Sequence, residues 1–287
     1  MAFNFQTFQT RALTAIVFVL VMLTGLLWNQ WSFLILFSVI HFGCWIEYQK
    51  LVGLIDAEYQ QINSFHKYSI MLAGWGFMLW MANDSYYTGS LFLNKIGWWI
   101  FSGSMIIFGI SLILFYKKST PRLLSYSFMG FIYISLSWGL MMCLWSNINQ
   151  TVFVGENWIM PVLLIASIWI NDTMAYLVGS FIGKIPLSAI SPKKTREGTI
   201  GGAILAVLAI VLIGFYGFHF QIKPLLLISI TAAIAGTAGD LFESKLKRLA
   251  GVKDSGRIMP GHGGFLDRFD SLLLATTVVW VIFYLFY

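Results

Sequence analysis

Residues 199–219 read TIGGAILAVLAIVLIGFYGFH and contain no Asp, Glu, Lys or Arg. This length and polarity match the roughly 20 apolar residues with which an α-helix crosses the hydrocarbon core of a bilayer. Comparable runs recur along the chain, at about 12–28, 31–46, 68–82, 96–116, 123–145, 158–183, 224–242 and 271–287. The sequence therefore predicts an all-α, polytopic integral membrane protein with about nine transmembrane helices.

The composition also favours a bilayer environment. Of the 287 residues, 58% are hydrophobic and 10% are charged, whereas soluble domains carry about 25% charged residues. A soluble fold cannot enclose this much apolar surface, because single cores stop growing at about 250–300 residues. The two cysteines lie within apolar runs and predict neither a disulfide framework nor a zinc site. We expect no cleaved signal peptide, because the first apolar run is long and no small-residue cleavage site follows it.

The basic residues are distributed asymmetrically around these spans. If the N-terminus is cytoplasmic, 16 of the 18 Lys and Arg residues face the cytoplasm, and only Lys95 and Lys223 lie on the other side. This is the pattern of the positive-inside rule. It accounts for the net charge of +6 without a nucleic-acid partner. We therefore expect an N-terminus in the cytoplasm, and the absence of a transit peptide favours a bacterial inner membrane.

The chain changes character in its second half. Residues 1–150 hold about five spans with scattered polar residues, and residues 151–287 hold about four spans with cytoplasmic loops at 184–198 and 243–270. Ten of the 16 cytoplasmic basic residues lie in these two loops, a concentration that orientation alone does not require. The sequence thus predicts an N-terminal transmembrane region and a C-terminal catalytic region, with its site on the cytoplasmic side.

Two carboxylates lie within apolar runs. Asp172 is about midway along the sixth run, and Asp240 is near the end of the eighth, after a series of Ala and Gly residues. A charge at membrane depth costs about 2.5–3.5 kcal/mol or more, so it usually faces a cavity or a cation. The small residues before Asp240 allow helix backbones to approach closely. The alternative for both carboxylates is a hydrogen bond that only packs helices together.

The two loops have the composition of anion-binding sites. Residues 243–270 alternate basic groups, four acids including Glu243, a His-Gly-Gly turn and further glycines. Carboxylates in such company would repel phosphate unless a cation bridges them, and Mg²⁺ takes one or two carboxylates together with phosphate oxygens. In the other loop, residues 191–198 suit a phosphate at a helix start. Ordinary helix capping and contact with anionic lipid head groups remain open for that loop.

Two spaced motifs in this half resemble a known family. The longer one reads Ser244-x-Leu246-Lys247-Arg248-x4-Lys253-Asp254-x-Gly256-x3-Pro260-Gly261-His262-Gly263-Gly264-x2-Asp267-Arg268-x-Asp270. The other combines Asn171-Asp172-Thr173-x-Ala175-Tyr176 with Ser191-Pro192-Lys193-Lys194-Thr195-x-Glu197-Gly198. Both resemble the phosphatidate cytidylyltransferase (CDP-diacylglycerol synthase) family, over about residues 169–271. Met259 and Arg196 depart from its usual pattern, and neither change removes a functional group.

The resemblance implies an enzyme of phospholipid biosynthesis that transfers CMP from CTP to phosphatidate and releases pyrophosphate. The implied cofactor is Mg²⁺ bound by Asp240 and Asp267, with a second cation left open. The implied catalytic residues are Asp240, Asp267, Asp270, Lys247, Arg248 and His262. The implied substrate-binding residues are Asp172, Ser191, Lys193, Lys194, Thr195, Ser244, Lys253, Asp254, Gly263, Gly264 and Arg268. Membrane lipids are further expected partners, and a homodimer is left open.

Two other functions fit part of this pattern. A cytidylyltransferase acting on another lipid phosphate would need the same phosphate-binding loops. An ion-coupled transporter would also place carboxylates in the membrane. The polar residues of this chain cluster toward one expected membrane face instead of forming a path across it, which favours an enzyme.

Overall fold

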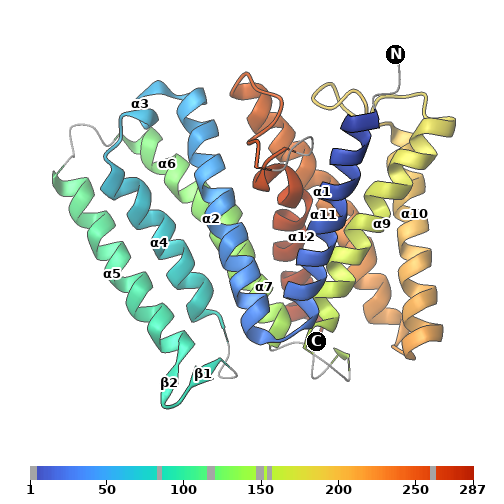
Figure 1. Ribbon diagram of the computed structural model, residues 1–287, viewed down its shortest axis with the longest axis horizontal. Coiled ribbons are helices and arrows are strands. Elements are labelled where there is room, and N and C mark those ends of the chain that lie inside the picture. Colours follow the sequence, from blue (N-terminus) through green and yellow to red (C-terminus); the bar gives the residue numbers. More distant parts are fainter. Residues whose placement is uncertain (1–4, 83–85, 115–119, 147–151, 154–156, 259–262) are drawn as a thin grey trace. The chain divides into compact units, whose positions relative to one another are not determined.

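The computed structural model describes residues 5–82, 86–114, 120–146, 152–153, 157–258 and 263–287 (Figure 1). Nearly all of these residues are helical, which confirms the all-α prediction. Within the described ranges, strands occur only in a short antiparallel hairpin of β1 (Tyr87–Thr88) and β2 (Leu91–Phe92). The fold is therefore a set of packed helices, as the apolar runs predict.

Packing divides the chain into two compact units. Unit 1 comprises Met1–Met142 and Leu246–Phe269, and unit 2 comprises Cys143–Lys245 and Asp270–Tyr287. These units differ from the regions 1–150 and 151–287 predicted from the sequence. That prediction concerned where the catalytic residues lie, and it stays a prediction. Residues 246–269, which carry much of the longer motif, belong to the unit of the N-terminal helices. The N-terminal helices thus contribute directly to the surroundings of that motif.

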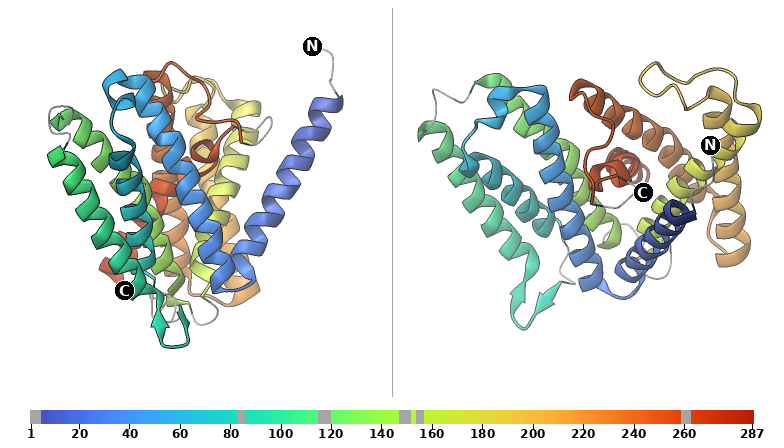
Figure 2. Two further views of the ribbon diagram at one scale, coloured as in Figure 1. Left: turned by 60° about the vertical axis from the view of Figure 1, so that its left-hand side comes forward. Right: turned by 45° about the horizontal axis from the view of Figure 1, so that its top comes forward.

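Unit 1 is built from the N-terminal helices. They are α1 (Phe5–Leu27), α2 (Gln30–Ile55), α3 (Ala57–Gln60), α4 (Ser64–Trp80), α5 (Leu93–Leu114) and α6 (Pro121–Gly130), followed by a π-helical segment η2 (Phe131–Leu136) and α7 (Ser137–Ser146). α4 and α5 pack side by side along their length (Figure 2). α2 lies inside the unit, since its aromatic side chains Phe33, Phe37 and Trp45 are fully buried.

The π-helical segment brings a serine hydroxyl to two side chains of α2. The Ser135 hydroxyl accepts a 2.8 Å hydrogen bond from the Trp45 indole and lies 3.2 Å from Nε2 of His41. A side chain at Gly74 would collide with this hydroxyl. Single π-turns inside α-helices shift side chains out of register with the preceding turn. Here the result is a polar contact between α2 and η2 inside the unit.

Unit 2 is built around four long helices. They are α9 (Ile159–Ile182), α10 (Arg196–Leu212) with the π-helical η3 (Ile213–Gly217), most of α11 (Ile222–Leu249) and most of α12 (Phe265–Phe286). α9 and α10 pack along their length, because α10 presents Gly198 and Gly202 to α9. A Cβ at Gly202 would lie 2.6 Å from the backbone nitrogen of Ala175. Small residues of this kind let membrane helices approach closely.

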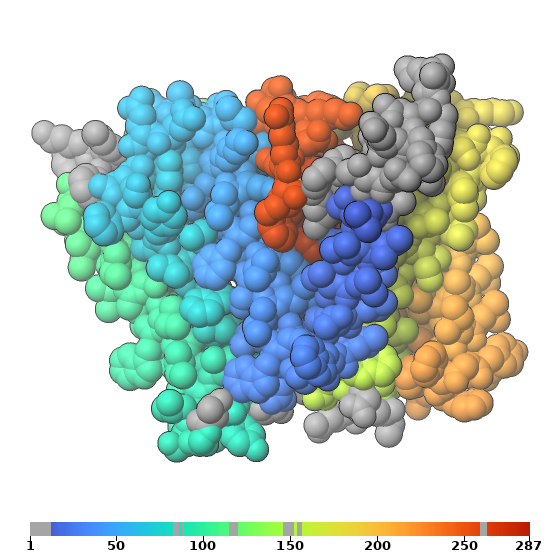
Figure 3. Space-filling model, in the orientation of Figure 1, coloured from blue at the N-terminus to red at the C-terminus, as the bar shows by residue number. Residues whose placement is uncertain are grey.

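The outward side chains of these helices are mostly apolar. α1, in dark blue on the face shown in Figure 3, exposes Leu13, Ile16, Val17 and Leu20. α5 likewise exposes Ile106 and Ile113, and α10 exposes Leu208 and Leu212. Exposed apolar area this extensive would cause a soluble protein to aggregate. It suits contact with lipid chains.

Seven helices of the described chain have the length and apolar composition to cross a membrane. They are α2, α5, the helix Pro121–Trp145, α9, α10 with η3, α11 and α12. A shorter apolar helix, Leu13–Leu27 of α1, occupies the first expected span, and α4, with 17 residues, lies over most of the third. The polytopic helical fold is confirmed, and the count of nine crossings stays a prediction.

The irregular segment between the last two long helices is shorter than the expected cytoplasmic loop 243–270, whose position relative to the membrane stays a prediction. α11 continues to Leu249, and α12 begins at Phe265, so the loop between them covers residues 250–264 only. α11 ends where Gly251 adopts a positive φ of 69° and donates to the carbonyl of Arg248, while Val252 donates to that of Lys247. This is a Schellman motif. The basic residues before it stay helical, because cations stabilise a helix C-terminus.

Candidate active site

Unit 2 contains a cavity of about 400 Å³. Its walls come from α9, the loop before α10, the start of α10, and α11. The residues that line it are Asn171, Asp172, Ala175, Tyr176, Lys193, Lys194, Thr195, Thr199, Thr237 and Asp240. Five of them are site residues predicted from the sequence: Asp172, Lys193, Lys194, Thr195 and Asp240. The cavity therefore brings Asp240 together with both blocks of the shorter motif, 171–176 and 191–198, which are separate along the chain.

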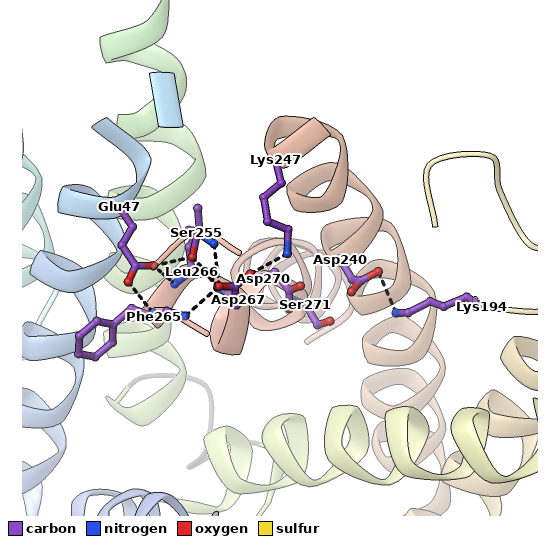
Figure 4. A network of polar contacts seen from close by, with 11 residues as sticks. Glu47, Lys194, Asp240, Lys247, Ser255, Phe265, Leu266, Asp267, Asp270 and Ser271 are labelled. Carbon is purple, nitrogen blue, oxygen red and sulfur yellow. Dashed lines mark hydrogen bonds and ion pairs between the residues drawn. The ribbon is translucent and has the colours of Figure 1, made fainter. Parts of the chain in front are cut away.

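Lys194 is the electrostatic centre of this cavity. Its Nζ lies 2.8 Å from Oδ2 of Asp240 (Figure 4). Burial alone would lower the pKa of Lys194, but the carboxylates of Asp240, Asp172 and Asp270 outweigh burial and hold the pKa above the ordinary value of 10.5. Lys194 is therefore charged at any physiological pH. If all three carboxylates were ionised, their charge would exceed that of the one ammonium, and a further cation would balance it.

The loop that carries Lys194 has a defined conformation. Leu187 donates to the backbone carbonyl of Lys194 at 2.7 Å, and Thr195 caps α10 by accepting from Gly198. The carboxylate of Glu197 accepts hydrogen bonds from the backbone nitrogens of Lys184 and Ile185, at 3.1 and 3.2 Å. Carboxylates at a helix N-terminus are stabilised by the helix dipole. Glu197, which was quoted in the motif but not predicted as a site residue, thus fixes the start of the lysine loop.

Unit 1 holds a second cluster, centred on Asp267. Oδ1 of Asp267 lies 2.6 Å from Nζ of Lys247, which approaches from α11. Oδ2 accepts from the backbone nitrogens of Ser255 and Gly264, both at 2.8 Å, and from the Ser255 hydroxyl at 2.9 Å. Both oxygens of this carboxylate are therefore occupied by donors of the protein itself. Three of these residues, Lys247, Gly264 and Asp267, were predicted as site residues.

Glu47 completes this cluster and was missed by the sequence analysis. It lies on α2 and is only 8% exposed. Its carboxylate accepts from the backbone nitrogens of Phe265 and Leu266, both at 2.9 Å, and from the Ser255 hydroxyl at 2.6 Å (Figure 4). The available signal was an acidic residue at the end of an apolar run. It was hidden because Glu47 precedes Gln49 and Lys50, which read as the start of a polar loop.

The remaining predicted residues neither line the cavity nor hydrogen-bond to Asp267 or Glu47 in the described part of the chain. Ser244 is half-buried on α11, Ser191 lies in the lysine loop outside the cavity lining, and Asp270 is buried and accepts from the nitrogen of Ser271 at 2.6 Å. Arg248, Lys253, Asp254 and Arg268 have exposed side chains. Gly263 has a positive φ of 86° beside Asp267. His262 lies outside the described residues.

The described residues contain no group of three or more His, Cys, Asp and Glu side chains arranged to hold a metal ion. Where Mg²⁺ binds together with a nucleotide, it usually takes one or two carboxylates plus phosphate oxygens and water. Asp240 and Asp172 both line the cavity and supply such a pair. Asp267 belongs to unit 1, and the cation that it was expected to share with Asp240 stays a prediction.

Comparison with known proteins agrees with these features. The model of the cytidylyltransferase family matches residues 9–286. A phosphatidate cytidylyltransferase from Staphylococcus haemolyticus is 53% identical over 108 residues, which cover 37% of this chain and 42% of that protein. One from Staphylococcus aureus is 44% identical over 126 residues, covering 43% and 48%. These alignments thus span less than half of each relative. Because the family match covers nearly the whole sequence, the chain belongs to the cytidylyltransferase family.

Proposed function

We propose that this protein transfers CMP from CTP to phosphatidate, producing CDP-diacylglycerol and pyrophosphate. The observation that carries the proposal is the cavity of unit 2, where Lys193 and Lys194 face Asp240 and Asp172 within apolar helices. Its volume of about 400 Å³ lies within the roughly 300–1,000 Å³ typical of ligand sites. The names of the Staphylococcus relatives support the same reaction.

CMP transfer requires stabilisation of negative charge more than it requires a strong base. A phosphate oxygen of phosphatidate forms a bond to the α-phosphorus of CTP, and the bond from that phosphorus to the bridging oxygen of pyrophosphate breaks. The attacking phosphate is already anionic near neutral pH, so no residue has to remove a proton. Lys193 and Lys194 would neutralise charge as the two polyanions meet. Asp240 would hold the Lys194 ammonium in place.

We further propose that Mg²⁺ assists this reaction, with Asp240 as its main protein ligand and Asp172 beside it. When bound, the ion would stabilise negative charge on the triphosphate and on the departing pyrophosphate. The carboxylates would repel CTP without it, since Asp172, Asp240 and Asp270, when all are ionised, carry more charge than Lys194. A second cation stays open.

The side of the membrane and the acceptor follow from the same proposal. CTP is a cytoplasmic metabolite, so the cavity would open toward the cytoplasm, and phosphatidate would enter with its acyl chains still in the bilayer. The positive-inside pattern then places the C-terminus outside. A reporter fused after Tyr287 should be active only if it functions outside the cytoplasm. A cytoplasmic signal would show that the number of crossings is wrong by an odd number.

The decisive assay uses purified protein in lipid nanodiscs with Mg²⁺ and CTP labelled at its α-phosphate. The acceptors are phosphatidate, a polyprenyl phosphate and an ether-lipid phosphate, each presented alone. We expect label in the lipid fraction and one pyrophosphate per transferred CMP, with phosphatidate preferred. Transfer only to another lipid phosphate would correct the acceptor. Absence of transfer, with ion flux in nucleotide-free proteoliposomes, would overturn the proposal in favour of a transporter.

Association into a homodimer stays a separate prediction. The mass of the protein in single nanodiscs tests it directly. A mass of one chain per disc at several protein-to-lipid ratios would contradict it.

A further inference from the structure

The carboxylate of Glu47 occupies the N-terminus of α12. The first backbone N–H groups of an α-helix have no partner within the helix, and the helix dipole favours negative charge there. Glu47 accepts from two of these groups, those of Phe265 and Leu266. The carboxylate comes from α2, more than 200 residues away in sequence. A side chain of the N-terminal helices thus determines where α12 begins.

The Ser255 hydroxyl connects Glu47 to Asp267. It lies 2.6 Å from Oε2 of Glu47 and 2.9 Å from Oδ2 of Asp267. A serine hydroxyl has one hydrogen to donate, so it donates to one carboxylate at a time. Ser255 is 2% exposed, and water has little access to replace either bond. The backbone N–H of Asp267 donates to the same hydroxyl oxygen at 3.3 Å. The hydroxyl can therefore donate to Glu47 while it holds the backbone of Asp267, whose carboxylate pairs with Lys247.

Two glycines of the longer motif lie against the same carboxylate. A Cβ added at Gly256 or at Gly264 would collide with Oε1 of Glu47. Neither glycine has a positive φ in the described chain, so its backbone conformation does not demand glycine. Glycine is required at both positions because the Glu47 carboxylate occupies the space that a Cβ would need. The glycine pattern of the motif and the acidic residue on α2 are thus two parts of one contact.

We propose that Glu47 is a positioning residue for the CMP-transfer reaction. Its carboxylate fixes the start of α12 and, through Ser255, holds Asp267 against Lys247. Glu47 does not touch substrate in this assignment. The effect on turnover rests on the proposed function, whereas the effect on the backbone of Phe265 and Leu266 does not.

The test compares Glu47→Gln with Asp56→Asn, both in nanodiscs. Asp56 is a matched control, because it is another buried carboxylate of unit 1 that caps a helix, α3. Hydrogen exchange read by mass spectrometry should show at least tenfold faster exchange at Phe265 and Leu266 in Glu47→Gln and no change there in Asp56→Asn. In transfer assays kcat should fall at least tenfold in Glu47→Gln, with little change in the KM for CTP.

A second pair of variants tests the contact itself. Gly256→Ala should reduce kcat strongly in the wild-type background, because its methyl group collides with Glu47. In a Glu47→Ala background the methyl group meets only the Cα of Gly264, at 3.2 Å, and Gly256→Ala should cost less than threefold further. Unchanged exchange at Phe265 and Leu266 in Glu47→Gln, or fully independent effects of Gly256→Ala and Glu47→Ala, would overturn the inference. If wild-type protein transfers no CMP, the proposed function fails, and the exchange data still decide the role of Glu47.

Discussion

The two carboxylate clusters contain the same kinds of residue but differ in what surrounds them. In unit 1, Asp267 has both oxygens bound by Lys247, Ser255 and Gly264, and Glu47 is bound by three donors in the same way. In unit 2, Asp240 pairs with Lys194 at the wall of a cavity of about 400 Å³. The first cluster is filled by the protein, and the second leaves space for a ligand.

This difference separates two roles for the carboxylates of the C-terminal half. A carboxylate whose acceptor sites are all used holds the backbone around it, and its removal leaves buried donors unpaired. A carboxylate beside a cavity can meet a cation or hold a lysine toward a phosphate. We therefore expect the variants of the two clusters to differ in stability as well as in activity.

The largest effect is expected for Asp240→Asn. Removing its charge releases Lys194 and the proposed cation ligand together, so transfer should fall by about 100-fold or more, the cost of losing a main electrostatic contact in an active site. Because Lys194 still faces Asp172 and Asp270, the melting temperature should stay near that of wild type. Turnover with labelled CTP and thermal unfolding in nanodiscs measure the two quantities.

Asp267→Asn should reduce activity and stability together. Hydrogen bonds to a charged, buried group contribute about 1.5–3 kcal/mol, and the amide cannot accept from Lys247 and two backbone nitrogens as the carboxylate does. Thermal unfolding should therefore begin several degrees lower than in Asp240→Asn. A stable Asp267→Asn protein that has lost its Mg²⁺ dependence would break the comparison and support the cation predicted to join Asp240 and Asp267.

The lysine pair of the cavity should show a graded effect. Lys194→Ala should raise the KM for CTP about tenfold or more, because charge-assisted hydrogen bonds contribute about 1.5–3 kcal/mol. Lys193 is exposed and should contribute less, about threefold in KM, as partly solvated charges do. Steady-state kinetics of both single variants test this order. If both single variants had the kinetics of the wild type, the lysines of residues 184–195 would serve only to orient the chain in the membrane.

The sequence predicted the helices and the cavity residues for good physical reasons. Apolar runs such as 199–219 are stable only in a bilayer. Lys194 belongs to a recognisable motif, and Asp240 is a carboxylate within an apolar run, where a charge is costly unless it has a partner. The sequence did not reveal Glu47, since its partners are backbone N–H groups more than 200 residues away. It also placed the end of α11 too early, because basic residues that stabilise a helix C-terminus resemble a cytoplasmic loop.

The smallest effect is expected from pH. The folded pKa of Lys194 lies above its ordinary value of 10.5, so its ion pair contributes fully below that value and is lost only as the pH rises through the folded pKa. The KM for CTP should therefore not change through Lys194 between about pH 7 and about pH 9. A rise in the KM for CTP between about pH 7 and about pH 9 that is absent in Lys194→Ala would show instead that the pKa of Lys194 is lowered.

The comparison of the two clusters is tested most directly by the thermal shift that CTP with Mg²⁺ produces. A ligand stabilises the folded state in proportion to the logarithm of its concentration over its dissociation constant. We predict that CTP raises the melting temperature of the wild type and of Glu47→Gln, which starts lower, and that Asp240→Asn shows no shift. A full shift in Asp240→Asn, with none in Glu47→Gln, would place CTP away from the cavity of unit 2 and contradict this account.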